Sequence, residues 1–513
     1  MGFRGTSVGI SFSNVGVQHN PNTDALPPDV LVHPTTNVNF EDGGISSRGS
    51  TRLVNASPAY GGGRIWGGID YRKTDGTVQY QMVYADDGKI YKSTTDTVAT
   101  GLNVAARPSF VQAGDSIYFC NGVDAPLQGD PSAGNLAAFT HPATDWTADP
   151  PFQLLLHVNG ANRRLVGLSK TKVIFSKNGT LDEFVTGVVS YTVDVRGGLV
   201  GGFMFGSRLM VFGQDEALIF NTDDVDTTNW GYSKAPWVGG VAHFRLILPT
   251  ENDVLCMTDD GAIYSIARVQ AFNDYRKADL TKPAFIDRWI REHVKLASIA
   301  DFHAIWDPRL RVAKFFVVRA GRTQVESSVN FYPDRAEDRA WTIHENLSST
   351  SGYNASCSFR VHASAGSNLV YTGDYAGSLW KLEQPDRNDN GAAFPAKFRL
   401  PHLNLGDLRR AKRFVRGFLI LEPQGNYSLT VKIWVDGVAK PATTVSMAGS
   451  GAVLGAFILG IDVLGGRTLA RAAFNIGYRG ERLQLEFSNS NVDQPFFVSQ
   501  LLVDMVPLGA RPS

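Results

Sequence analysis

The segment Asp86-Asp87-Gly88-Lys89-Ile90-Tyr91 has a close copy in Asp259-Asp260-Gly261-Ala262-Ile263-Tyr264 and a looser one in Gly373-Asp374-Tyr375-Ala376-Gly377-Ser378-Leu379-Trp380. In each copy the aspartate can accept backbone hydrogen bonds within a turn, and the glycine can adopt a positive φ. The apolar and aromatic residues that follow suit the start of a buried strand. The pattern therefore predicts tight turns that lead into short strands.

Further turn-and-strand units lie between these copies. From about residue 64 to residue 383, turns with Asp or Gly precede runs in which apolar and polar residues alternate, as burial of one sheet face requires. Residues 206–212 are followed at once by residues 213–220, their expected hairpin partner. Such units, roughly 30 to 60 residues apart, predict an all-β fold with a β-propeller of six or seven degenerate blades. We place the blades at residues 64–95, 106–140, 151–190, 199–225, 238–275, 285–345 and 352–383.

The three turns resemble degenerate Asp-boxes, the turn motif of sialidase-like propellers. In that family the motif belongs to the scaffold and takes no part in catalysis, and the resemblance implies the same role here. Turn formation also explains adjacent acidic pairs such as Asp223 with Asp224. Folding could still bring carboxylates together as a glycosidase pair, and spacing along the chain leaves that open.

The composition indicates two domains and no strong electrostatic field. The chain has 513 residues, of which 43% are hydrophobic, and single cores stop growing at roughly 250 to 300 residues. Charged residues are 19%, below the roughly 25% of an ordinary soluble domain, which favours large buried or assembled surfaces. Lys plus Arg and Asp plus Glu number 49 each, so no overall charge attracts nucleic acid or an acidic membrane. The longest uncharged apolar run, residues 447–461, is shorter than the roughly 20 residues of a membrane span, so we expect no membrane anchor.

Motifs for catalysis and for metal binding are missing from the sequence. Cys120, Cys256 and Cys357 are far apart and lack metal-ligand spacing, so we interpret them as buried small hydrophobic residues from a reducing compartment. The 10 histidines form no i, i+4 pair. The chain contains neither a Gly-x-Ser-x-Gly elbow nor a Gly-x-x-x-x-Gly-Lys-Ser/Thr loop. We therefore expect no enzyme activity, no cofactor and no metal.

One segment interrupts the β pattern, at residues 282–294. Apolar residues recur there at helical spacing just after a proline, which predicts a short amphipathic helix. The residues expected on its apolar face are Phe285, Ile286, Trp289 and Ile290.

The chain changes character after a linker-like run at residues 383–390. Longer alternating strands follow, which predict a second β domain of sandwich type. A glycine-rich segment, residues 449–466, is either a loop at the tip of this domain or part of a long hairpin. We therefore expect an N-terminal arm and the start of the propeller at 1–60, a β-propeller at 61–385 and a C-terminal β-sandwich at 386–513.

A local basic cluster stands out against the neutral overall charge. It lies at the entrance of a predicted strand, where a solvated strand edge or an inter-subunit salt-bridge patch is the favoured interpretation. The alternative is contact with DNA, which would involve phosphate groups only and would not read sequence. The residues of the cluster are Arg409, Arg410, Lys412, Arg413 and Arg416.

The order of these features resembles the tail nozzle or hub proteins of short-tailed bacteriophages, also called packaged-DNA stabilization proteins or head-to-tail connectors. Near the start, Asn37-Val38-Asn39-Phe40 is followed by a turn at Arg48-Gly49, and the propeller repeats come next. Gly477-Tyr478-Arg479-Gly480-Glu481-Arg482 then precedes a strand of the last domain. The resemblance covers about residues 35–510 as an order of features.

The resemblance implies a structural role in the virion. In that family six copies form a ring below the portal and adaptor proteins, which continues the DNA channel, retains the packaged genome and conducts it during ejection. It implies as partners further copies of the chain, the adaptor and portal, tail fibre or needle proteins, and double-stranded DNA in non-specific contact. The protein would be found in the phage tail, and in the host cytoplasm during assembly.

Two other functions remain open at this stage. One is a glycan-binding or glycan-hydrolysing propeller of a virion or bacterium, which the Asp-box-like turns would support. The other is a cellular propeller scaffold that binds partner proteins. A hexameric ring, hydrolysis of a host surface glycan, or a stable monomer bound to a cellular partner would distinguish the three.

Overall fold

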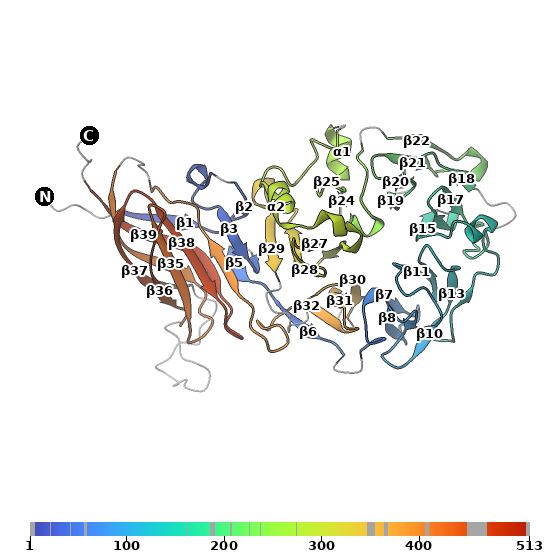
Figure 1. Ribbon diagram of the computed structural model, residues 1–513, viewed down its shortest axis with the longest axis horizontal. Helices are drawn as coiled ribbons and strands as arrows, with labels where there is room; N and C mark the ends of the chain where they lie inside the picture. The colour runs from blue at the N-terminus through green and yellow to red at the C-terminus, as the bar shows by residue number, and fades with distance from the viewer. Residues whose placement is uncertain are drawn as a thin grey trace.

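The computed structural model describes the chain at residues 6–20, 22–41, 43–55, 59–160, 162–184, 190–205, 208–224, 226–235, 238–272, 274–345, 354–363, 368–405, 410–448 and 469–508. The molecule is elongated: Figure 1 shows small sheets on the right, two longer sheets on the left, and both chain ends on the left. Within the described ranges, no helix is long and apolar enough to span a membrane.

Seven small antiparallel sheets follow one another through the described chain, and they are the blades of a β-propeller. Blade one contains β7 (Ile65–Arg72), β8 (Gln79–Ala85), β9 (Ile90–Tyr91) and β10 (Thr97–Ala99). Blade two contains β11 (Ser109–Ala113), β12 (Ser116–Cys120), β13 (Leu127–Gly129) and β14 (Ala137–Ala138). Blade three contains β15 (Gln153–Asn159), β16 (Asn162–Leu168), β17 (Lys172–Phe175) and β18 (Ser190–Thr192).

The other four blades complete the ring. Blade four contains β19 (Gly201–Phe205), β20 (Arg208–Phe212), β21 (Ala217–Asn221) and β22 (Gly231–Lys234). Blade five contains β23 (Ile247–Pro249), β24 (Val254–Met257) and β25 (Ile263–Ser265), and is followed by helix α1 (Ile266–Phe272). Blade six contains β26 (His303–Asp307), β27 (Val312–Val318), β28 (Val325–Phe331) and β29 (Trp341–Glu345). Blade seven contains β30 (Cys357–His362), β31 (Asn368–Gly373), β32 (Leu379–Gln384) and β6 (Ser50–Leu53).

The ring is closed by contacts between first strands and by one borrowed strand. The first strand of each blade contacts the first strand of the next, from β7 to β30, and β30 packs back against β7. In blade seven, β6 from the N-terminal part pairs with β32, with Arg52 opposite Lys381. The prediction of a propeller with six or seven blades is confirmed, and the structure has seven. The expected hairpin of residues 206–220 is also confirmed, because β20 pairs with β21.

The repeated turns lie between the second and third strands of blades one, five and seven. Gly88, Gly261 and Gly377 have φ values of 72°, 86° and 80°, in the region that favours glycine. In the third copy, one carboxylate oxygen of Asp374 accepts a hydrogen bond from the Ser378 amide at 2.7 Å. The predicted turns before short strands are therefore confirmed.

The segment between blades five and six contains the predicted helix, α2 (Ile286–His293). Ile286, Trp289 and Ile290 are buried, as expected. The placement of Phe285 on the apolar face was wrong: this residue precedes the helix with a φ of 57° and is 38% exposed. The helix begins one residue later than its apolar pattern, so the Phe285 side chain leaves that face.

The second domain is a sandwich of two six-stranded sheets. The first sheet, hereafter the outer sheet, contains β37 (Ala470–Gly480), β34 (Lys412–Leu421), β39 (Phe497–Pro507), β5 (Gly44–Ser47) and β4 (Val38–Glu41), with β1 (Thr6–Ser11) beside β39. The second sheet contains β2 (Val17–Gln18), β3 (Leu31–Thr36), β33 (Ala396–Arg399), β38 (Leu483–Asn489), β35 (Ser428–Val435) and β36 (Val438–Ser446).

The expected domain boundaries need one correction. Residues 1–60 were expected to be an arm and the start of the propeller, and 386–513 to form the sandwich alone. In the structure, β1 to β5 belong to the two sandwich sheets, and only β6 enters the propeller. Strands from both ends of the chain thus complete the sandwich. The N-terminal strands join the sandwich because they pair with its other strands through backbone hydrogen bonds. For example, β1 pairs antiparallel with β39 over six residue pairs, from Thr6 with Met505 to Ser11 with Gln500.

The two domains share one continuous core. Apolar side chains of both sandwich sheets, such as Phe414 and Phe487, pack together between the sheets. Val312 and Tyr332 of blade six belong to the same buried cluster. The propeller and the sandwich are therefore packed against each other at blade six.

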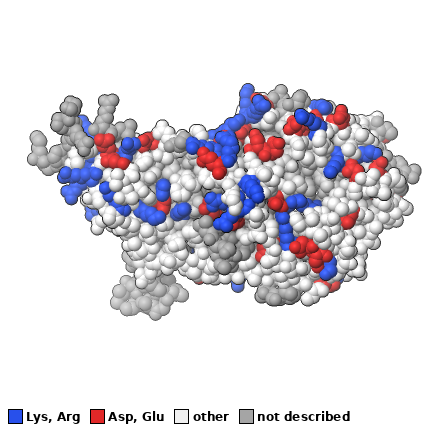
Figure 2. Space-filling model, in the orientation of Figure 1, with Lys and Arg blue, Asp and Glu red and all other residues white. Residues whose placement is uncertain are grey.

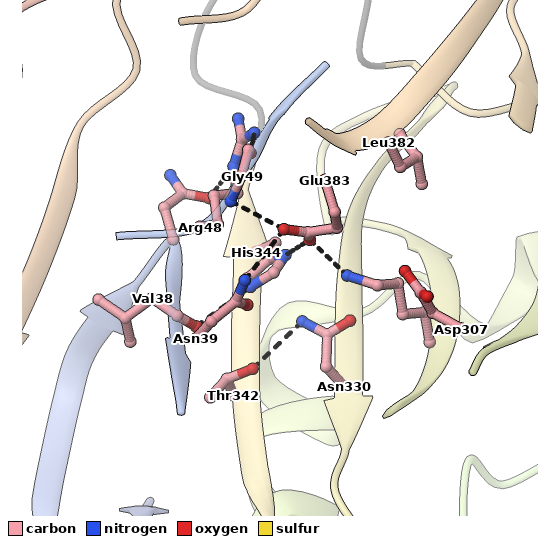
Figure 3. Close-up of polar contacts among 12 residues, drawn as sticks. Val38, Asn39, Arg48, Gly49, Asp307, Asn330, Thr342, His344, Leu382 and Glu383 are labelled. Carbon is pink, nitrogen blue, oxygen red and sulfur yellow. Dashed lines mark hydrogen bonds and ion pairs between the residues drawn. The ribbon is translucent and has the colours of Figure 1, made fainter. Parts of the chain in front are cut away.

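A buried polar network also lies at this junction (Figure 3). One Glu383 oxygen accepts a hydrogen bond from Lys314 Nζ at 2.6 Å, and the other accepts from the Gly49 amide at 2.8 Å and from Asn39 Nδ2 at 2.9 Å. Burial opposes ionisation of Glu383, but the Lys314 ammonium outweighs it and holds the pKa of that carboxyl well below its usual value. The pair joins blade six to the end of blade seven.

A second buried ion pair fixes the segment that crosses between the domains. Arg48 is 1% exposed and donates to both oxygens of Asp389, at 2.9 and 2.5 Å. Its Nε donates to Asn37 Oδ1 at 3.2 Å, and its guanidinium lies 3.8 Å from the centre of the Phe394 ring. Asn37 Nδ2 in turn donates to the Pro395 carbonyl at 2.8 Å. The distinctive sequence around residues 37–53 is thus the connection between the sandwich and the propeller.

Candidate functional site

The predicted basic cluster lies on the outer sheet of the sandwich. Arg410, Arg413 and Arg416 are exposed there. Arg409 lies outside the described residues, as does the glycine-rich segment 449–466. Because β34 is a central strand of this sheet, its exposed arginines lie on a broad face. This places part of the cluster on a surface, away from the strand edge that the sequence suggested.

Lys412 is not available to a partner, which corrects its inclusion in the cluster. It is 2% exposed, and its Nζ donates to the carbonyls of Arg410 and Glu481 at 3.1 and 3.2 Å. Alternation along β34 turns the Lys412 side chain inward, where backbone oxygens replace water around the ammonium. Arg413, the next residue, points outward.

Two arginines lie opposite each other at one end of this face. Arg413 of β34 pairs in register with Arg479 of β37, and both are exposed. Neither makes an ion pair with a carboxylate of the described chain. Like charges directly opposite in a sheet repel each other, so an anion placed between them would be favoured.

The adjacent row of the face is partly neutralised. Arg416 Nε donates to an Asp504 oxygen at 2.8 Å, and this hydrogen bond holds the pKa of the Asp504 carboxyl below its usual value. The Arg471 guanidinium lies 3.6 Å from the centre of the Phe418 ring, and the Arg416 guanidinium lies 4.9 Å from the same ring centre. Beside them is a hollow of about 450 Å³, lined by Thr6, Ser7, Val415, Arg416, Asn475, Asp504, Met505 and Val506.

We define the basic face as Arg413, Arg416, Arg471 and Arg479. It carries four guanidinium groups, and among the described residues one carboxylate, Asp504, forms an ion pair with one of them, Arg416. Figure 2 shows Lys and Arg at the sandwich end and across the middle of the molecule, and most of the visible acidic residues over the middle and the propeller. The face can attract anionic groups electrostatically.

The sequence did not predict that Arg471 and Arg479 belong to the basic face. Arg471 and Arg479 are contributed by β37, about 60 residues after the predicted cluster, and they reach Arg413 and Arg416 only through strand pairing. The exposed positions of β37 alternate with buried Phe474 and Ile476. That alternation predicts an exposed arginine side, but it does not reveal the neighbouring strand.

The acidic pairs in the propeller turns bear on the alternative glycosidase function. Asp259, Asp260 and Asp279 line a hollow of about 490 Å³ between blades four and five. An Asp260 oxygen accepts from the Thr258 hydroxyl, and an Asp279 oxygen accepts from the Thr281 amide at 2.9 Å. The Asp260 and Asp279 carboxylates are therefore engaged in shaping their own turns, which for Asp260 favours the predicted structural role.

The sheets define the chain as a seven-bladed β-propeller joined to a β-sandwich. Strands from the N-terminal and the C-terminal parts of the chain together form the sandwich. No protein-family model and no curated protein matches the sequence. Similar solved structures include BBS1N, solved in complex with ARL6DN, at 9% identity, covering 67% of this chain and 98% of that chain with a TM-score of 0.39.

Two further solved structures show comparable similarity. BamB from Moraxella catarrhalis is 10% identical, with 74% of this chain and 98% of that chain covered and a TM-score of 0.35. The computationally designed Ika8 protein is also 10% identical, with 72% and 99% covered and a TM-score of 0.35. BBS1N and BamB are β-propellers.

Proposed function

We propose that this chain is a structural component of the tail of a short-tailed bacteriophage. In this proposal six copies form a ring below the portal and adaptor, and the ring continues the DNA channel, retains the packaged genome and conducts it during ejection. The observation that carries the proposal is an uncharged flank of the molecule, which is the surface that a ring would bury between neighbouring copies.

The uncharged flank is visible along the lower side of Figure 2, where the described surface is mostly free of charged residues. At the sandwich end this side includes β36 (Figure 1). Within the described chain, β36 has a strand partner on one side only, and Lys440 is its single charged residue. An exposed strand edge with few charges readily pairs with another chain unless a neighbour covers it. A ring neighbour would provide that cover.

The basic face suits a channel that passes DNA without holding it. Each phosphate that an arginine neutralises releases counterions and adds affinity, so a long basic lining would slow the passage of DNA. Four arginines, one of them paired with Asp504, offer only a few phosphate contacts. Such contacts are independent of sequence, as conduction of a whole genome requires.

Replacing Thr444 with aspartate tests the ring. Thr444 is exposed on β36, and a charge buried between neighbouring copies without a partner is costly. We expect Thr444→Asp to lower the hexamer fraction by at least about tenfold at a fixed chain concentration, because about 1.4 kcal/mol per interface suffices for that change. Sedimentation velocity on the purified chain, alone and with portal and adaptor proteins, measures the fraction.

The matched control is Ser233→Asp. Ser233 is likewise an exposed residue of an edge strand, β22 of blade four, and it lies away from the proposed interface. The control should assemble like the wild type. Equal assembly of Thr444→Asp and wild type would remove β36 from the interface, and a wild-type chain that stays monomeric in every mixture would overturn the ring itself.

The double variant Arg413→Gln/Arg479→Gln tests DNA contact. If both arginines meet phosphates, the slope of log K against log salt should become less negative by about 0.9 for each phosphate that is no longer neutralised. Fluorescence anisotropy of a labelled duplex, between about 50 and 200 mM NaCl, measures this slope. Arg196→Gln, at an 89% exposed arginine of the propeller, is the control. An unchanged slope in the double variant would assign the basic face to contacts between subunits.

A further inference from the structure

A second group of arginines lies where the first strands of the propeller begin. Arg64 and Arg107 stand just before β7 and β11, and Arg245 lies in the short 3-10 helix Phe244–Leu246 that leads into β23. Asp301 ends the 3-10 helix Leu296–Asp301, which leads into β26. Since the first strands surround the propeller axis and these four residues precede first strands, they gather at one end of that axis.

Ion pairs and aromatic stacking connect the members of this axial cluster. Asp301 Oδ1 lies 3.0 Å from Arg64 Nη1 and 2.8 Å from Arg107 Nη2. The Arg64 guanidinium lies 4.0 Å from the centre of the Trp66 ring and 4.7 Å from that of Tyr375. The guanidinium groups are thereby held in fixed orientations between blades one, two, six and seven. Such preorganised donors are suited to binding an anion.

The axial cluster carries more positive charge than its carboxylate can neutralise. Asp301 pairs with Arg64 and Arg107, whereas Arg245 donates through Nη2 to the Ser356 carbonyl at 2.8 Å and pairs with no carboxylate of the described chain. Burial and then the positive charges of Arg64 and Arg107 lower the pKa of Arg245 to about 10. Burial and the charge of Arg245 likewise keep the pKa of His303 well below its usual value. The cluster is therefore a region of positive potential inside the protein.

Several nitrogen atoms of the cluster are buried without a hydrogen-bond acceptor. They are Nε and Nη2 of Arg64, Nε of Arg107 and Nη1 of Arg245. A buried donor without an acceptor costs on the order of 1 to 3 kcal/mol. Such orphaned donors in a positively charged region indicate an acceptor that belongs to a ligand.

Two hollows are lined by arginines of the cluster. A cavity of about 140 Å³ is lined by Arg245 and Trp66, together with Gly67, Gly68 and Ser358. A second hollow, of about 420 Å³, is lined by Arg107 and includes Lys170 and His243. Each space is thus lined by one arginine of the cluster, Arg245 in the first and Arg107 in the second.

We propose that the axial cluster of Arg64, Arg107 and Arg245 binds an oxyanion, a phosphate or a carboxylate group, which shares the Arg64 and Arg107 donors with Asp301. The site recognises the chemistry common to both groups, namely a negative charge spread over oxygens that accept several N–H donors. It belongs to the propeller of one chain and does not depend on ring assembly.

Isothermal titration calorimetry with inorganic phosphate and with acetate, at constant ionic strength in chloride, tests the proposal. We expect saturable phosphate or acetate binding with a Kd on the order of 1 mM or tighter. The stronger of the two identifies the tetrahedral or the planar group as the preferred ligand. Arg245→Gln should weaken binding about tenfold or more, because a hydrogen bond to a charged group is removed. Arg107→Gln, at a residue 24% exposed, serves the same purpose if Arg245→Gln does not fold.

The variant Asp301→Asn distinguishes an anion-binding cluster from one with a structural role only. Removing the competing carboxylate should strengthen binding of the anion, by about tenfold, because the guanidinium groups then need a counter-charge. Arg196→Gln, at an exposed propeller arginine outside the cluster, should bind like the wild type. Binding no stronger than that of chloride in the folded wild type, or weaker binding in folded Asp301→Asn, would overturn the proposal.

Discussion

Replacing Asp389 with alanine is expected to lower the free energy of unfolding by about 3 to 5 kcal/mol, which is the cost of removing one partner from a buried ion pair. Asp389 and Arg48 are each 1% exposed, so water cannot replace the missing carboxylate. The Thr51 amide and hydroxyl, which both donate to Asp389 at 3.0 Å, would be deprived of their acceptor as well. Urea denaturation followed by circular dichroism measures the change.

The chain offers a close control for this variant. Arg52 and Asp386 lie 4.0 Å apart, with side chains 68% and 54% exposed, only a few residues from the buried pair. Asp386→Ala should change the free energy of unfolding by less than about 1 kcal/mol, as for other exposed pairs. Similar effects for Asp389→Ala and Asp386→Ala would show that the junction does not depend on the buried pair.

Acid should destabilise the protein strongly between pH 6.5 and pH 3. Burial, assisted by the neighbouring Lys314 ammonium, lowers the pKa of His344 to about 3, and burial with the nearby His33 lowers that of His19 to about 3. The unfolded chain binds a proton at these histidines below about pH 6.5, whereas the folded chain does so only near pH 3. The stability contributed by the neutral rings is therefore complete above pH 6.5 and is lost as the pH falls.

The size of this acid effect follows from the pKa difference. For fully buried His344, the loss is about 2 kcal/mol at pH 5 and about 4 kcal/mol at pH 3. His344→Gln keeps a donor for the Val38 carbonyl, which accepts from His344 at 3.1 Å, and should show a correspondingly smaller loss between pH 7 and pH 5. His362→Gln, at a side chain 61% exposed, is the control. Denaturant titrations at each pH give these values, and parallel pH profiles for His344→Gln and the wild type would contradict the assignment.

Local signals explain why the propeller could be predicted from the sequence. Each Asp-Gly turn, as at Gly88 or Gly261, is defined by residues next to it in the chain. The same holds for the alternation that identifies β35 and for the apolar spacing of α2. Within one blade, neighbouring strands are also neighbours in sequence.

Contacts between distant segments account for what the sequence did not reveal. The pairing of β1 with β39 joins the two ends of the chain, and no local pattern selects that partner. The opposition of Arg413 and Arg479 depends on the register of β34 with β37. Likewise, Arg64 and Arg245 meet only because the ring of blades closes. The residues next to Arg64, Arg245, Arg413 and Arg479 in sequence do not distinguish these arginines from ordinary surface residues.

The burial of charged side chains also depends on contacts that the sequence does not reveal. Lys412 was grouped with exposed arginines because it stands among them in sequence, yet strand alternation turns it inward to backbone carbonyls. The sequence around Asn37 is distinctive, and in the structure it forms the junction, where Arg48 pairs with Asp389, more than 300 residues away in sequence. Sequence identified the segment, and only the fold identified its partner.

Electron microscopy of the purified chain, alone and mixed with portal and adaptor proteins, tests the proposed function most directly. The proposal predicts a closed ring of six copies, about 335 kDa or six times the 55.8 kDa of one chain, around an open bore wide enough for a DNA duplex. Single, unassembled subunits in every mixture, with the uncharged flank exposed to solvent, would contradict it.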